Sequence, residues 1–146
     1  MKRLLVITGL LFGLGATGWT NGATVEEEIS TADAIAIHVV VQTQLNAFAE
    51  DDAVGAFELA TTDAQVKVGS PDKFLHLVKQ HYNPIYRHRT AMFSLPEVIE
   101  GETIQIVRVT DRDSHVWVAV YHMQRDQDGS WKIDGCELLE TTSISI

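Results

Sequence analysis

Two stretches near the C-terminus decide the fold: HVWVAVYHMQR at residues 115–125 and SWKIDGCELLE at residues 130–140. Both are rich in Val, Ile and aromatic residues, which favour β-strands. The intervening DQDG, residues 126–129, contains an Asp-Gly pair of the kind that closes a tight hairpin. If this pair forms a two-residue turn, His122 lies opposite Gly135. The C-terminal part of the chain is therefore predicted to be an antiparallel hairpin.

Two further strands are predicted before this hairpin. They are IYRHRTAMFSL at residues 85–95 and ETIQIVRVTD at residues 102–111, and both carry the same β-favouring residue types. EG at 100–101 and DRDS at 111–114 are turn signals between the strands. The four strands should therefore follow one another as a meander.

The region before the strands shows helical periodicity and helix-capping residues. Ser30 and Asp33 have capping-box spacing, and Ser70 followed by Pro71 is typical of a helix start. The predicted helices cover residues 30–52, 51–62 and 69–82. Helices and strands that do not alternate indicate an α+β domain. We expect three N-terminal helices packed on one face of a curved, four-stranded antiparallel sheet.

The predicted strand around VWVAVY, residues 116–121, is apolar on both faces. An antiparallel strand with one face in water normally alternates apolar with polar residues. Helices can cover only one side of this sheet, so a second subunit is expected on the other. The sequence thus predicts a homodimer formed through the sheet face.

The chain has 146 residues and a formal net charge of −9. This length suits one domain with a single core. The acidic balance argues against nucleic-acid binding, which needs clustered Lys and Arg. The same charge repels anionic membrane surfaces.

The N-terminus reads as an export signal. A basic start, MKR, precedes the apolar run at residues 4–16, and small residues follow it. We expect a signal peptide at residues 1–23, cleavage after Ala23, and a lead-in segment at residues 24–34. The mature protein should be periplasmic or secreted, with no membrane association once the signal is removed. An uncleaved membrane anchor is the alternative.

No metal site or cofactor is expected from the sequence. The six histidines form no His-x-x-x-His pair or tight His/Cys cluster, and the glycines fit no phosphate-binding loop. The single cysteine, Cys136, cannot form an internal disulfide and is expected to be a buried apolar residue.

Three stretches carry a family resemblance: QTQLNAFAEDDAVGAFELAT, GSPDKFLHLVKQHYNPIYRHR and DGSWKIDGC. They resemble a bacterial family known as domain of unknown function 4864. The order of elements is similar to the nuclear transport factor 2-like superfamily, also described as a cystatin-like cone. The resemblance implies a cone-shaped α+β domain over residues 35–142. It implies no particular activity.

The segment HYNPIYRHR, residues 81–89, is a candidate ligand-binding site. Tyr82, Tyr86 and Arg87 could line a pocket rim and contact a small molecule. The alternative is a structural corner, in which Pro84 ends the helix and the tyrosines bury their rings.

His122 and Glu137 are the candidate catalytic residues. In the predicted register they lie diagonally on one face, so they could act as a base and its orienting partner if a cavity covers them. The alternative is a core histidine beside a solvent-facing glutamate. On the other face, Asp134 should reach Arg125 in a salt bridge.

The function expected first is a non-enzymatic module that binds a small molecule or self-associates through its sheet. The alternative is a small-molecule isomerase, cyclase or hydrolase that uses general acid/base catalysis in the cone pocket. A closed cavity lined by titratable side chains within hydrogen-bond reach of each other would favour the enzyme.

Overall fold

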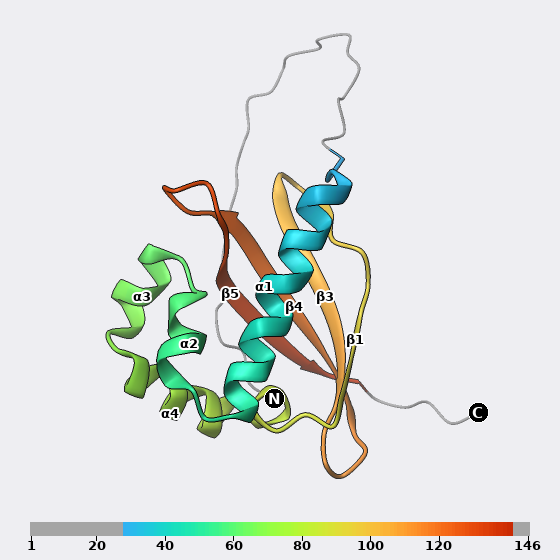
Figure 1. Cartoon of the computed structure of the whole chain (residues 1–146). Coiled ribbons are helices and arrows are strands. Elements are labelled where there is room, and N and C mark those ends of the chain that lie inside the picture. The colour runs from blue at the N-terminus through green and yellow to red at the C-terminus, as the bar shows by residue number, and fades with distance from the viewer. Residues whose placement is uncertain (1–27, 142–146) are drawn as a thin grey trace, which may run out of the picture.

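The computed structural model describes residues 28–141, so the predicted signal peptide and residues 24–27 of the lead-in segment lie outside the described residues. Within that range the chain forms five helices and five strands (Figure 1). In chain order they are α1 (Thr31–Ala49), α2 (Ala53–Glu58), α3 (Thr62–Val68), α4 (Pro71–His81), α5 (Asn83–Tyr86), β1 (Thr90–Phe93), β2 (Glu97–Ile99), β3 (Glu102–Thr110), β4 (Val116–Arg125) and β5 (Trp131–Glu140). The predicted α+β class is confirmed. The predicted count of three helices and four strands is wrong, because α3, α5 and β2 were not expected.

The longer helices begin at side-chain caps, as the sequence suggests. Ser30 accepts a hydrogen bond from the Asp33 N–H and Ser70 accepts one from the Lys73 N–H. The unexpected helix α3 is capped in the same way: the Thr61 hydroxyl accepts a hydrogen bond from the N–H of Ala64, the third residue of the helix. Such caps satisfy backbone donors that would otherwise lack a partner.

The corner after α4 differs from the prediction. Tyr82, with φ −131° and ψ 41°, interrupts the helix, and the chain then makes one more helical turn, α5. Pro84 therefore does not end the helical region: it occupies the first turn of α5, where its missing N–H costs nothing. β1 consequently begins only at Thr90.

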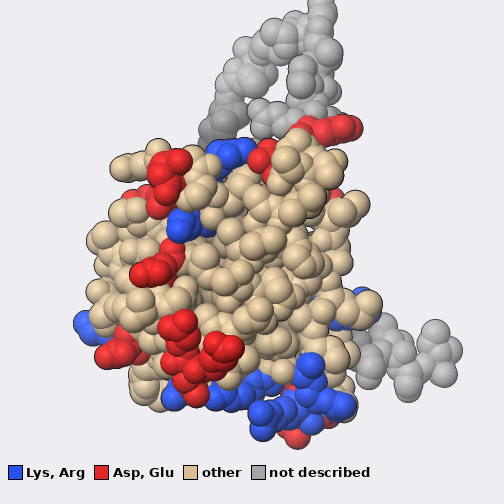
Figure 2. All heavy atoms as spheres, in the orientation of Figure 1, with Lys and Arg blue, Asp and Glu red and all other residues tan. Residues whose placement is uncertain are grey.

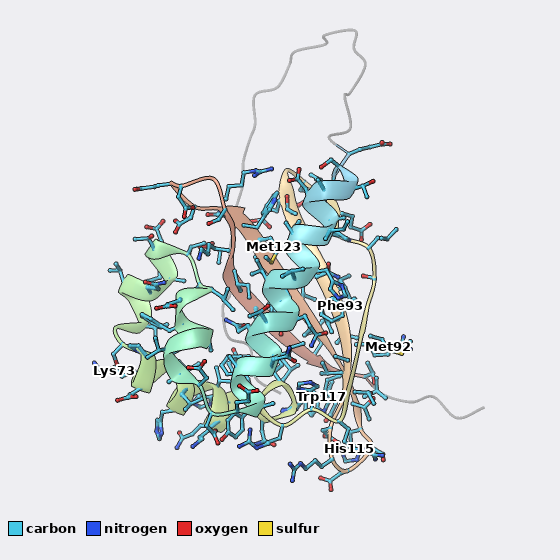
Figure 3. All side chains as sticks on the ribbon, viewed as in Figure 1. Lys73, Met92, Phe93, His115, Trp117 and Met123 are labelled. Carbon is cyan, nitrogen blue, oxygen red and sulfur yellow. The ribbon has the colours of Figure 1, made fainter. Side chains whose placement is uncertain are left out.

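The strands form one antiparallel sheet in the order β1-β3-β4-β5, and β2 also pairs with β3. Successive side chains point to opposite faces. In β1, Phe93 points toward α1 and Met92 points away from it; Met123 of β4 also lies beneath α1 (Figure 3). The face toward the helices is the inner face, and the opposite one is the outer face. His122, next to Met123, therefore belongs to the outer face.

The β4–β5 hairpin corrects the predicted turn. The Asp126 N–H donates to the Ser130 carbonyl, and Gly129 has φ +84°, so three residues rather than two form the loop. A bulge then shifts the register: Met123 pairs with Ile133, but His122 pairs with Gly135. The extra residue, Asp134, has no partner on β4. The loop is one residue longer than predicted, and the bulge shifts the register back by one residue, so the predicted His122–Gly135 pairing is found.

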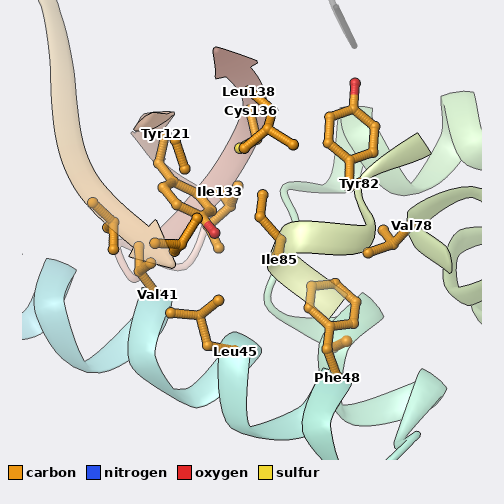
Figure 4. Packing of buried hydrophobic residues seen from close by; sticks show 14 of the residues in the cluster. Val41, Leu45, Phe48, Val78, Tyr82, Ile85, Tyr121, Ile133, Cys136 and Leu138 are labelled. Atoms are coloured by element: carbon orange, nitrogen blue, oxygen red, sulfur yellow. The ribbon is translucent and has the colours of Figure 1, made fainter. Parts of the chain in front are cut away.

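The core lies between α1 and the inner face. Ile37, Val41, Leu45 and Phe48, at steps of three or four along α1, are all at most 1% exposed. Figure 4 shows Val41, Leu45 and Phe48 facing the side chains of β4 and β5, with Ile85 of α5 beside them. Truncating Leu45 to Ala should cost about 2–5 kcal/mol of stability, the range for a buried leucine.

Charge is unevenly distributed over the surface. α1 contains no Asp, Glu, Lys or Arg after Asp33, and the space-filling view shows a broad uncharged area in the same orientation as Figure 1 (Figure 2). Its outward side chains include Ile35, 60% exposed, and Val39, 53% exposed. Among residues 28–141, no helix combines the length and the hydropathy needed to cross a membrane.

Candidate functional site

A cavity of about 320 Å³ lies between the helices and the inner face of β4 and β5, and we call it the main cavity. This volume is at the lower end of the range for small-molecule sites. Its walls are largely apolar side chains from five elements: Phe48 of α1, Val68 of α3, Phe74, Leu77 and Val78 of α4, Ile85 of α5, and Ile133 of β5. Such walls suit an apolar ligand.

A few polar side chains also line the main cavity: Gln44, Lys67, Tyr82, Tyr121, Asp134 and Cys136. Most of those inside it are neutral. Gln44, 4% exposed, is held by a bond from its Nε2 to the Ala56 carbonyl, 3.1 Å away. Gln44 thus already has a hydrogen-bond partner within the protein, which sets it apart from the tyrosines described next.

Tyr121 is the central polar group. It is 1% exposed, and its hydroxyl has no hydrogen-bond partner among the described residues. In Figure 4 this hydroxyl points from β4 into the space between the sheet and the helices. Burial, followed by the charge of Cys136 and its side-chain contact with the hydroxyl, raises the tyrosine pKa well above its ordinary value. The hydroxyl is therefore a neutral donor, and the weakly accepting Cys136 thiol is a polar neighbour of it.

Tyr82 lines the same cavity from the α4–α5 corner. It is 2% exposed, and its hydroxyl also lacks a partner within the described part of the chain. Burial raises its pKa, with smaller contributions from the charges of Cys136 and Glu137. A buried hydroxyl without a partner costs about 1–3 kcal/mol. In Figure 4 the Tyr82 hydroxyl points away from the Tyr121 hydroxyl, so Tyr121 is the group that a ligand in the cavity would meet.

The helix α3, which the sequence did not predict, forms one wall of the main cavity. Its start is fixed to the sheet: the Thr61 hydroxyl donates to Asp134 Oδ1 at 2.8 Å, and the Thr62 hydroxyl donates to Asp126 at 3.0 Å. Gln65 holds it to α2 by donating to the Phe57 and Ala60 carbonyls. Its last turn places the exposed Lys67 at the cavity.

The bond from Thr61 also corrects an expectation about Asp134. The predicted salt bridge with Arg125 is absent, because Asp134 is the bulge residue and turns toward α3. Arg125 instead binds Asp33 at the start of α1, with 2.7 Å between Nη2 and Oδ1. Asp134 thus positions α3 beside the cavity.

Cys136 follows the expectation of a buried residue, at 9% exposure. Burial, followed by the nearby Glu137 charge, raises the pKa of its thiol. The thiol therefore stays protonated at neutral pH and is a poor nucleophile. This argues against covalent chemistry at Cys136.

The candidate ligand-binding residues do not lie together. Tyr82 lines the main cavity, but Tyr86 and Arg87 do not. The Tyr86 hydroxyl donates to Asp51, the Arg87 Nη2 lies 3.1 Å from Asp51 Oδ2, and the guanidinium stacks 3.8 Å from the Tyr86 ring centre. Arg87 also donates to the Phe48 carbonyl at the end of α1. These contacts hold α5 against the end of α1.

The candidate catalytic pair lies on the outer face. His122 Nε2 is 4.0 Å from Glu137 Oε1, and its Nδ1 is 3.6 Å from Glu102 Oε2. The sequence placed His122 and Glu137 diagonally on one face, and the paired register has this arrangement. Neither residue lines the main cavity, which is on the other side of the sheet.

Two other features could bind a ligand in principle. Asp111, Asp113 and His115 place potential metal-ligand atoms within 4.8 Å of one another. Asp111, however, already accepts bonds from two turn N–H groups and from the Trp117 indole. The second feature is a groove of about 300 Å³ between α1 and residues 94–96, which includes the buried Gln105.

The comparison with protein families decides where this chain belongs. A family model described as "Domain of unknown function (DUF4864)" matches residues 30–146. The chain belongs to the DUF4864 family. The match spans every helix and strand described above, including α3 and the β5 bulge. No curated protein and no solved structure matches this DUF4864 chain.

Proposed function

We propose that this DUF4864 protein is an exported, non-enzymatic module of the nuclear transport factor 2-like kind that binds a small apolar molecule in the main cavity. The observation that carries the proposal is the buried Tyr121 hydroxyl, which faces an apolar cavity and has no partner among the described residues. The ligand would be an apolar body with one oxygen that accepts a hydrogen bond from Tyr121.

The physical reason is the cost of the empty site. Without a ligand, the Tyr121 hydroxyl is shielded from bulk water and has no hydrogen-bond partner within residues 28–141. A ligand oxygen in the cavity would recover that bond, while its apolar part would bury surface worth about 25 cal/mol per Å². An apolar pocket with a few well-placed polar groups is the usual form of a small-molecule site.

The enzymatic alternative has weaker support. It required His122 and Glu137 to border a pocket, and both lie on the outer face, away from the main cavity. Within the cavity, Tyr121 and Cys136 have raised pKa values and are protonated at neutral pH. Such groups can bind a carbonyl, but they do not accept a proton from a substrate at that pH.

The test compares two ligands of similar shape, 2-acetylnaphthalene and 2-ethylnaphthalene, which differ in one carbonyl. Both should bind, and the ketone should bind more tightly. Tyr121→Phe should weaken ketone binding by about three- to tenfold, the value of one net hydrogen bond, and leave the hydrocarbon unaffected. Calorimetric titration measures both. Absence of binding by both compounds at their solubility limit would refute the proposal.

We also propose that the protein self-associates through the outer face. The supporting observation is the set of apolar side chains on that face: Val118 and Val120 of β4 are only half-buried, Leu139 of β5 is 42% exposed, and Met92 of β1 is 68% exposed. The exposed Arg108 of β3 interrupts this set, because it lies between Met92 and Val118. Covering such side chains with a second copy would remove apolar area from water.

The variant that tests self-association is Val118→Glu, because the register places Val118 on the outer face opposite Leu139. It should convert dimers to monomers in light scattering at micromolar concentration. Ile35→Glu is the matched control: Ile35 is 60% exposed on α1, on the other side of the sheet, and its substitution should leave the dimer intact. A monomeric unmodified domain would contradict the proposal.

A further inference from the structure

We propose that the ligand of the main cavity is an organic monocarboxylate, with its apolar body inside the cavity and its carboxylate at Lys67. This inference rests on the proposed function and names the chemical class of its ligand. It follows from where charge is found, and where it is missing, around the cavity.

The inner part of the cavity carries no charge. Its polar groups are the Tyr121 hydroxyl, the Cys136 thiol and the amide of Gln44, and the Tyr82 ring lines the cavity beside them. Burial raises the pKa of both tyrosines and of the thiol, so all three stay neutral. A charged group placed there would lose its hydration without gaining an opposite charge. The charged end of any ligand must therefore be at the cavity edge.

Lys67 is the only cationic side chain among the residues that line the main cavity. It is exposed and stands in the last turn of α3, which is fixed to the sheet through Thr61 and Asp134. Among the ion pairs formed within residues 28–141, none involves Lys67. Its ammonium group is thus available to an anion, and its position on a fixed helix keeps it at the cavity.

The charges at the cavity disfavour a dianion more than a monoanion. Lys67 supplies one positive charge, and the Asp134 carboxylate, which also lines the cavity, supplies one negative charge. Asp134 is already bonded to Thr61, but its charge would repel a second negative charge on a ligand. A dianion such as a phosphate monoester is therefore disfavoured relative to a carboxylate.

The experiment measures binding of 6-acetyl-2-naphthoate, whose acetyl group can reach Tyr121 while its carboxylate stays at the edge, and of the neutral 2-acetylnaphthalene. Calorimetric titrations use the mature chain and three variants: Lys67→Ala, Lys67→Arg and Lys73→Ala. Lys73→Ala is the matched control, because Lys73 is exposed on α4 and does not line the cavity, and its substitution removes the same charge as Lys67→Ala.

Lys67→Ala should weaken binding of the carboxylate by about three- to fivefold, the range for one solvent-exposed ion pair, and the loss should shrink at high salt. Binding of the neutral ketone should not change. Lys67→Arg should retain carboxylate binding, and Lys73→Ala should behave like the unmodified protein.

Two results would overturn the inference and leave the proposed function in place. In the first, the ketone binds, and the carboxylate binds the unmodified and the Lys67→Ala proteins with equal affinity. The other is an equal loss of carboxylate affinity in Lys73→Ala, which would indicate a general effect of net charge. If neither compound binds the unmodified protein, both proposals fail.

Discussion

Replacing Tyr121 by Phe should make the unliganded protein more stable. The hydroxyl is buried with no partner among the described residues, and such a group costs about 1–3 kcal/mol. Phe keeps the ring in place and removes only the oxygen. After allowance for the contacts of that oxygen, we expect a gain of about 1 kcal/mol. For a domain of this size the gain should raise Tm by about 3–6 °C.

Tyr86 provides the opposite control. Its hydroxyl donates to the Asp51 carboxylate, so Tyr86→Phe removes a bond that the protein makes. A bond to a charged acceptor contributes about 1.5–3 kcal/mol. Because the Asp51 side chain is 49% exposed, solvent weakens the bond, and a loss of about 1 kcal/mol is expected. The two Tyr→Phe changes should therefore shift Tm in opposite directions.

Thermal unfolding followed by circular dichroism, with urea titration as a second measure, checks both variants. A destabilised Tyr121→Phe protein would refute the reasoning, since it would mean that the hydroxyl has a partner in the folded state. Adding 2-acetylnaphthalene should reverse the order, because the ligand stabilises the unmodified protein more than it stabilises Tyr121→Phe.

Three further predictions concern other parts of the chain. Cys136 should react with a thiol reagent only on the unfolding timescale, since burial raises its thiol pKa; rapid labelling of the native protein would contradict this. Hydrogen bonding from Tyr86 lowers the pKa of Asp51 below its ordinary 3.8, so Asp51 should stabilise the fold above about pH 4 and lose this contribution as pH falls further. Acid titration of Asp51→Asn should show a smaller loss than the unmodified protein, and an equal loss would count against it. Mass spectrometry of the protein from its native host should find a new N-terminus near Thr24, whereas an intact Met1 chain recovered from membranes would exclude cleavage.

Local chemistry predicted much of the fold. Ser30 and Ser70 were identified as helix starts, and each side chain accepts the expected capping bond. The apolar spacing of α1 also predicted its buried face. These features depend on residues only a few positions apart, so their signals are complete within the sequence.

The elements that were missed depend on distant contacts. Helix α3 is seven residues long and has no fully buried side chain, so it has no strong periodicity; Thr61 and Thr62 hold it by bonds to Asp134 and Asp126, more than sixty positions away. Strand β2 has three residues and exists through its pairing with β3. Neither carries a local signal strong enough to identify it.

The site was predicted only in part for the same reason. Tyr82 was chosen for its place beside Pro84, and it does line the main cavity. Tyr121 was seen only as one apolar residue in a two-sided strand, because the sequence cannot show that a helix far away leaves space above it. Tyr86 and Arg87 drew attention as a polar cluster, but their partner, Asp51, lies 35 and 36 positions earlier in the chain.

The edge of β5 is partly covered beside the Asp134 bulge, and this limits how a second molecule can pair with the sheet. β5 is an edge strand of the sheet, and such edges can recruit strands from other molecules. Here the backbone at Ile133 already exchanges hydrogen bonds with Leu59 and Thr61, which occupy the edge at that residue. A continuous sheet running from one molecule into the next through the whole of β5 is therefore blocked. In the crowded space outside the cytoplasm proposed for this protein, that protection would limit fibre-like aggregation.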